Sequence, residues 1–191
     1  MYIENNYWNH YIGDTDDSLT LVDYLADKGK EEISLREIFS DTGLDKLNWE
    51  FRQKDSWLEY KDKTGCEHEF YYAIDLITDL AALILECKMS GSVNLCELYG
   101  GDLDAASNVR ITATQEEMEK MNIALADFVS EPLAYDLSEM CPEEDMQEMA
   151  KLCEELRKEF VCLIRINRQL PFYRAGIHDG YLHVWIFGSG V

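Results

Sequence analysis

The most apolar stretch of the chain covers residues 71–89, and the predicted fold is organised around it. Apolar side chains recur there at helical spacing and cover most of the circumference, which predicts a helix buried in the core. Asp75, Asp79 and Glu86 are spaced four and seven residues apart. We therefore expect them to form one polar edge that reaches solvent or a groove.

The residues before this helix predict both short helices and short strands. Residues 2–12 mix aromatic side chains with Asn and His, which favours a strand or an irregular edge. A helical pattern then ends at Lys28, with Gly29 as its C-cap. Ser34, with Glu37 three residues later, predicts the capping box of a second helix. Alternating apolar and polar residues over 57–72, interrupted by a turn-like KDKTG, predict a hairpin.

After the central helix, a connection rich in Gly, Ser and Asp covers 90–107, with one short strand expected at 93–98. A strand at 109–113 and a helix follow, and Thr114 and Glu117 form the capping box of that helix. The last helix is predicted to begin at Pro142 and to continue to about Arg168.

The carboxyl-terminal residues predict a β-hairpin, because Asp179-Gly180 separates two alternating runs. In this register one face is apolar, and the other carries aromatic side chains mixed with Arg and His. That mixture is typical of binding hot spots, and it is equally consistent with a second layer buried under a helix. Its candidate binding residues are Arg174, His178, Tyr181, His183 and Trp185.

Together these elements predict one α+β domain over residues 1–191, with a possible hinge near 90–107. We expect a mainly antiparallel sheet packed against the buried central helix, and a hairpin at the carboxyl terminus. The oligomeric state is open.

The net charge of the chain limits the kinds of partner that we expect it to bind. The 191 residues carry a net charge of −21, which argues against binding to nucleic acid or to an anionic membrane. From residue 116 to residue 159 there are 14 acidic and 4 basic residues, a net charge of −10. The partner expected on electrostatic grounds is a basic protein or a metal ion. The alternative is that the charge only keeps the protein soluble.

The six cysteines show no CxxC pair and no zinc spacing, and no signal peptide or membrane-spanning run is recognisable. We therefore expect a cytoplasmic protein. Asp14, Asp16 and Asp17 precede a helix, where carboxylates stabilise the helix dipole. They do not fit a calcium loop, since Leu19 and Leu25 replace the required glycine and glutamate.

Catalytic motifs are missing from the sequence: it has no GxSxG, no Walker loop and no GxGxxG. We therefore expect no enzyme activity, no cofactor and no metal. The weaker alternative is a small hydrolase that uses His178 and His183 beside Asp179.

The aromatic-rich ends, NNYWNHYIGDTDD and YLHVWIFGSG, together with the small size and the acidity, resemble the immunity proteins of bacterial polymorphic toxin systems. The resemblance covers the general character of the chain and transfers no individual residue. It implies a protein that binds a cognate toxin and blocks the toxin's active site, often with acidic side chains where the toxin is a basic nuclease.

A protein of this kind would use carboxylates around aromatic anchors. The alternative function is an acidic adaptor or regulatory subunit, which differs mainly in its partner. The candidate residues are Asp14, Asp16 and Asp17 near the first long helix, Glu143, Glu144, Asp145 and Glu148 near the last helix, and Trp8, Tyr181 and Trp185 as anchors.

Overall fold

The computed structural model describes residues 1–53, 57–99, 108–169, 173–178 and 181–186, with side chains up to Ile164 apart from that of Tyr99. Helix α4 (Ala73–Ser90) lies at the centre, and every residue from position 73 to position 87 is buried. The expected polar edge is therefore wrong. Asp75, Asp79 and Glu86 are each at most 3% exposed, because neighbouring elements cover α4 on all sides.

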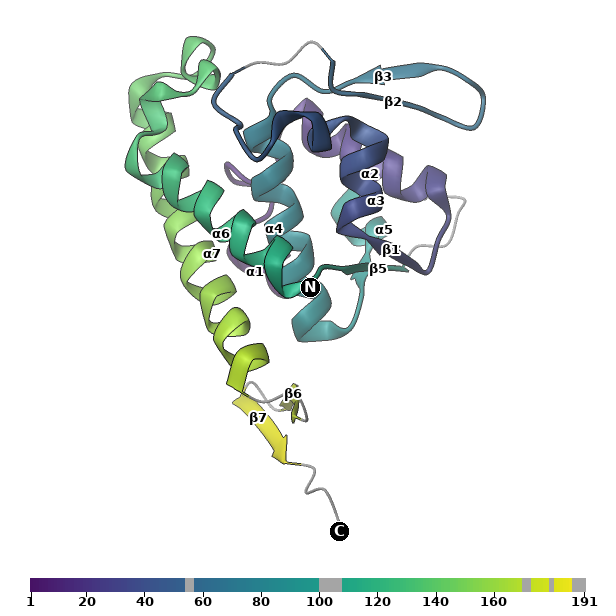
Figure 1. Cartoon of the computed structure of the whole chain (residues 1–191), viewed down its shortest axis with the longest axis vertical. Helices are drawn as coiled ribbons and strands as arrows, with labels where there is room; N and C mark the ends of the chain where they lie inside the picture. The colour runs from purple at the N-terminus through teal and green to yellow at the C-terminus, as the bar shows by residue number, and fades with distance from the viewer. Residues whose placement is uncertain (54–56, 100–107, 170–172, 179–180, 187–191) are drawn as a thin grey trace.

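Other helices surround α4 (Figure 1). Helices α6 and α7 pack against each other along one side of α4, and α2 and α3 lie on another side. The helix predicted from Pro142 to about residue 168 is confirmed as α7. The bounds are α2 (Asp16–Lys28), α3 (Leu35–Thr42), α6 (Gln115–Ser130) and α7 (Glu143–Gln169), with short 3-10 helices η1 (Leu44–Leu47), η2 (Pro132–Ala134) and η3 (Asp136–Glu139).

Helix ends follow local capping rules. Thr114 and Glu117 form the predicted capping box of α6. Thr15 and Ser18 form a capping box at the start of α2, and Asp16 and Asp17 lie in its first turn, as expected of carboxylates that stabilise the helix dipole. Gly29 ends α2 in the left-handed conformation at φ 60°, as expected of a C-cap glycine.

Strands are few and short. β1 (Glu32–Ser34) runs parallel to β5 (Asn108–Thr112), and β4 (Val93–Asn94) pairs antiparallel with the other edge of β5. The expected mainly antiparallel sheet is thus a small mixed sheet. The hairpin predicted within 57–72 is confirmed as β2 (Glu59–Lys61) and β3 (Glu67–Glu69).

The strand expected at 93–98 is wrong beyond its second residue. Helix α5 (Leu95–Tyr99) begins there, because the side-chain oxygen of Asn94 accepts from the Cys96 N–H at 3.1 Å and turns the chain. The predicted hinge falls partly on residues 100–107, which lie outside the described residues.

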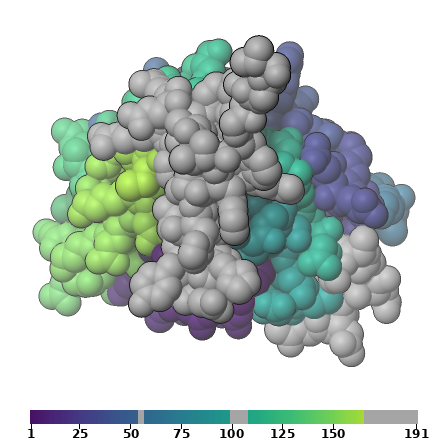
Figure 2. Space-filling view, turned by 90° about the horizontal axis from the view of Figure 1, so that it is seen from below, coloured from purple at the N-terminus to yellow at the C-terminus, as the bar shows by residue number. Residues whose placement is uncertain are grey.

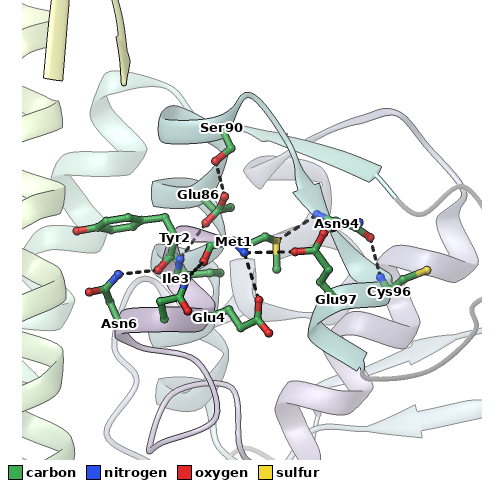
Figure 3. Close-up of polar contacts among 11 residues, drawn as sticks. Met1, Tyr2, Ile3, Glu4, Asn6, Glu86, Ser90, Asn94, Cys96 and Glu97 are labelled. Carbon is green, nitrogen blue, oxygen red and sulfur yellow. Dashed lines mark hydrogen bonds and ion pairs between the residues drawn. The ribbon is translucent and has the colours of Figure 1, made fainter. Parts of the chain in front are cut away.

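The amino-terminal segment forms helix α1 (Tyr2–Asn6), so the strand or irregular edge expected there is wrong. Figure 3 shows why this segment is fixed: the Ile3 N–H donates to the Glu86 carboxylate of α4 at 2.9 Å. The hydroxyls of Tyr2 and Tyr7 both donate to Glu159 on α7, at 2.8 Å each. Packing against two helices therefore outweighs the β-propensity of the aromatic side chains.

Helix α7 leads to β6 (Tyr173–His178) and β7 (Tyr181–Ile186), which pair antiparallel with Ile177 opposite Leu182. The turn predicted at Asp179-Gly180 lies outside the described residues, so the assignment of hairpin faces stays a prediction. In the view of Figure 2, the yellow-green surface of α7 and the blue-violet surface of α2 and α3 lie on opposite sides of the molecule.

Candidate functional site

The two acidic groups predicted from the sequence lie next to each other. The Tyr11 hydroxyl donates to the Asp145 carboxylate at 3.1 Å, which places the segment before α2 against the start of α7. Around this contact the candidate carboxylates Asp14, Asp16, Glu143, Glu144 and Glu148 are exposed. Asp14 and Glu144, which are 130 positions apart in the sequence, therefore contribute to one negative surface.

A pocket of about 360 Å³ opens on this surface, and we call it the acidic pocket. It lies where the amino ends of α2 and α4 meet the turn that follows η3. Beside it lie apolar groups that the sequence analysis missed: Tyr71 is 45% exposed and Met140 is 73% exposed. Its lining residues are Thr15, Asp16, Asp17, Tyr71, Tyr72, Asp75, Leu137 and Met140.

Asp17 was predicted as a partner-binding carboxylate, and the structure shows that it is buried at 2% exposure. Its oxygens accept from the backbone N–H groups of Tyr71 and Tyr72, each at 2.8 Å. It therefore holds the amino end of α4 against α2. The sequence did not reveal this role, because the contact joins residues 54 and 55 positions apart.

Two further carboxyl groups are buried, that of Asp75 in the pocket lining and that of Asp79 one turn later on α4. Asp75 is 3% and Asp79 is 1% exposed, and one oxygen of each has no hydrogen-bond partner among the described residues. The other oxygen of Asp79 accepts from the Gly13 N–H at 2.9 Å. Burial, followed by repulsion from Asp79 and Asp17, raises the pKa of Asp75 well above its usual range. Burial likewise raises the pKa of Asp79 to about 7.

Trp8 was predicted as an aromatic anchor for the partner, but its side chain is 2% exposed and is not available at the surface. Gly13, at φ 77°, packs on the indole: a Cβ there would lie 2.1 Å from a ring carbon. Trp8 therefore belongs to the core. The side chains of the other predicted contact residues lie outside the described part of the chain, namely Arg174, His178, Tyr181, His183 and Trp185.

A larger cleft of about 670 Å³ separates residues 46–53 from α6. The arginine in its lining is already paired: the Arg52 guanidinium contacts Asp127 and Glu131, each at 2.6 Å. None of the predicted contact residues lines it. We therefore place the candidate site at the acidic pocket, although that pocket is smaller.

Over the described ranges, no three His, Cys, Asp or Glu side chains are grouped so as to hold a metal ion. In the same ranges no helix is both long enough and apolar enough to cross a lipid bilayer.

Exposed apolar groups bordered by carboxylates, on a helical α+β domain, are typical of a protein-binding module. Residues 2–160 match the family described as Immunity protein 68, Imm68. This match covers most of the chain, and the chain belongs to that family. The comparisons with curated proteins and with solved structures gave no match.

The resemblance to immunity proteins is therefore confirmed, and the family implies a cognate toxin as the partner. Immunity protein families are generally not enzymes. The matched residues include the whole lining of the acidic pocket and end before β6 and β7.

Proposed function

We propose that this protein neutralises a basic toxin domain in the cytosol, and that the surface around the acidic pocket covers the toxin's active site. The observation that carries the proposal is the convergence of exposed carboxylates from α2 and α7 on the apolar groups of Tyr11, Tyr71 and Met140. This surface also lies within the matched residues 2–160.

The chemistry of the surface suits such a partner. A domain that acts on phosphate presents Lys and Arg side chains, and carboxylates can occupy the same positions through charge-assisted hydrogen bonds. The net charge of −21 would accelerate encounter with a basic partner. The partly exposed Tyr11 and Tyr71 and the exposed Met140 would supply the desolvated centre of the interface.

Neutralising exposed carboxylates on the surface around the pocket should slow association. The four-site variant Asp14→Asn, Asp16→Asn, Glu143→Gln, Glu144→Gln removes four exposed charges. With the cognate toxin domain, we expect the association rate constant at about 50 mM salt to fall at least about tenfold. The salt dependence of that rate constant should weaken in parallel, because fewer charges steer the encounter. Stopped-flow or biolayer measurements at low and high salt give both quantities.

A matched control separates the location of the charges from their number. Four exposed glutamates away from the pocket are changed to glutamine, giving the same change in net charge. If the association rate constant falls equally in both variants, the acidic pocket is not the binding surface. If it falls in neither variant, electrostatic steering is not the mechanism. The control sites are Glu31, Glu32, Glu116 and Glu155.

A further inference from the structure

Asp75 is the most unusual group in the acidic pocket. It lines the pocket, it is only 3% exposed, and its Oδ1 atom has no hydrogen-bond partner in the described part of the chain. Buried polar atoms are nearly always paired, because removal from water without a partner is costly. The Oδ1 atom itself is enclosed, but the Asp75 side chain lines the open pocket, so a ligand that enters the pocket and turns the carboxyl group can supply the missing donor.

We propose that the acidic pocket holds an arginine side chain of the toxin, with its guanidinium paired to the Asp75 carboxylate. This inference rests on the proposed function and names the group that the surface recognises. The pocket volume of about 360 Å³ is near the lower end of the range of ligand sites and suits one long side chain.

The charges around the pocket favour a cation. The lining contains three carboxyl groups, on Asp16, Asp17 and Asp75, and no basic residue. The amino ends of α2 and α4 oppose this with about half a positive charge each. Asp17 already accepts from two backbone N–H groups at α4, which offsets that helix end and leaves Asp75 as the available acceptor.

The walls favour arginine over lysine. Tyr71, Tyr72, Leu137 and Met140 provide aromatic and apolar surface for a long side-chain stem. A guanidinium is more weakly hydrated than an ammonium, stacks on aromatic rings, and donates in a planar fork that matches a carboxylate. A guanidinium would also offset the causes that raise the pKa of Asp75, which are burial and the neighbouring Asp79 and Asp17.

The first test uses the full chain and needs no toxin. N-acetyl-arginine-N-methylamide is titrated into the ¹⁵N-labelled protein, and the backbone amide signals of Tyr71 and Tyr72 are followed. We expect saturable shifts with a Kd in the millimolar range. The citrulline analogue, which has the same shape without the charge, should bind at least tenfold more weakly. Equal binding of the two ligands, or no shift at any concentration, would overturn the proposal.

Asp75→Asn should remove at least nine-tenths of this arginine affinity. The substitution replaces a buried acid by its neutral isostere, so the variant is expected to fold. Glu155→Gln, a change at an exposed site on α7, serves as the control and should bind arginine as the unmodified protein does. An Asp75→Asn variant that retains full affinity would contradict the pairing.

The toxin complex provides the second readout. With the cognate toxin domain, Asp75→Asn should raise the Kd at least about 30-fold, while the control variant leaves it unchanged. A toxin that binds tightly and equally to both variants would refute the arginine pocket and leave the proposed function standing. A toxin that does not bind the unmodified chain would refute the proposed function, whatever the arginine titration shows.

Discussion

Replacing Glu86 by alanine is expected to lower the free energy of unfolding by about 3 kcal/mol. Glu86 is fully buried on α4, and its two oxygens serve different donors (Figure 3). One oxygen accepts from the Ile3 N–H at 2.9 Å, and the other accepts from the Ser90 hydroxyl. Alanine leaves the buried Ile3 N–H unpaired and opens a cavity between α1 and α4, whereas the hydroxyl of the exposed Ser90 can bond to water. Urea denaturation followed by circular dichroism measures the change.

Glutamine at the same position tests whether the hydrogen bonds account for this loss. Glu86→Gln keeps the volume and keeps one oxygen for the Ile3 N–H, and its amide can donate to the Ser90 hydroxyl oxygen. We expect it to cost less than about 1 kcal/mol. If glutamine and alanine destabilised the protein equally, the ionised carboxylate itself would be required, and the argument from satisfied donors would fail.

The buried polar residues of α4 also show where inference from the sequence ends. Helical spacing predicted the helix and its burial correctly in outline. The same spacing assigned Asp75, Asp79 and Glu86 to an exposed edge, because three carboxylates in a row normally lie in water. In the structure each lies against a different segment: Asp75 faces the acidic pocket, Asp79 accepts from Gly13, and Glu86 accepts from Ile3. Periodicity carries no information about such long-range partners.

The candidate site was predicted in part. The exposed positions of Asp14, Asp16, Glu143, Glu144 and Glu148 agree with the charge argument, since ionised side chains without buried partners remain in solvent. What the sequence could not indicate is that the two groups share one surface, a fact that depends on the contact between Tyr11 and Asp145.

The aromatic side chains were harder to place. Trp8 was expected at a binding surface and is buried in the core. Tyr71 was expected in the buried helix and lies partly exposed in the pocket lining. Composition alone does not separate a core aromatic from an interface aromatic, because both roles depend on burial of the same apolar surface. One local signal was available for Trp8: Gly13 follows it closely, and only glycine fits against the indole ring there.

Replacing Asp79 by asparagine is expected to stabilise the protein at pH 8 by about 3 kcal/mol. Asp79 is 1% exposed and has one oxygen without a partner among the described residues, so its ionised form is costly. Asparagine removes the charge and keeps an oxygen for the Gly13 N–H. The same substitution should weaken the repulsion that Asp75 experiences, since Asp79 is one cause of its raised pKa.

The pKa of Asp79 determines how the stabilisation by asparagine changes with pH. Burial raises the pKa of Asp79 to about 7 in the folded protein, above the ordinary aspartate value of 3.8 that applies to the unfolded chain. Between these two values the folded state binds more protons than the unfolded state. The contribution of the group to stability is therefore complete below pH 3.8 and is lost as the pH rises through 7. The advantage of Asp79→Asn should accordingly be largest at pH 8 and should shrink towards zero as the pH falls to about 4.

Urea denaturation of the unmodified protein and of the Asp79→Asn variant, at pH 8 and at pH 5.5, tests this pH dependence of their stability difference. General repulsion from the net charge of −21 also changes with pH, but it acts on both proteins alike and cancels in their difference. Glu155→Gln, which removes one exposed charge from α7, should show a small difference from the unmodified protein at both pH values. An Asp79→Asn variant that is less stable at pH 8 would show that Asp79 is stabilised as an anion in the folded protein. An advantage of the same size at pH 5.5 would show that Asp79 does not titrate between these two pH values in the folded protein.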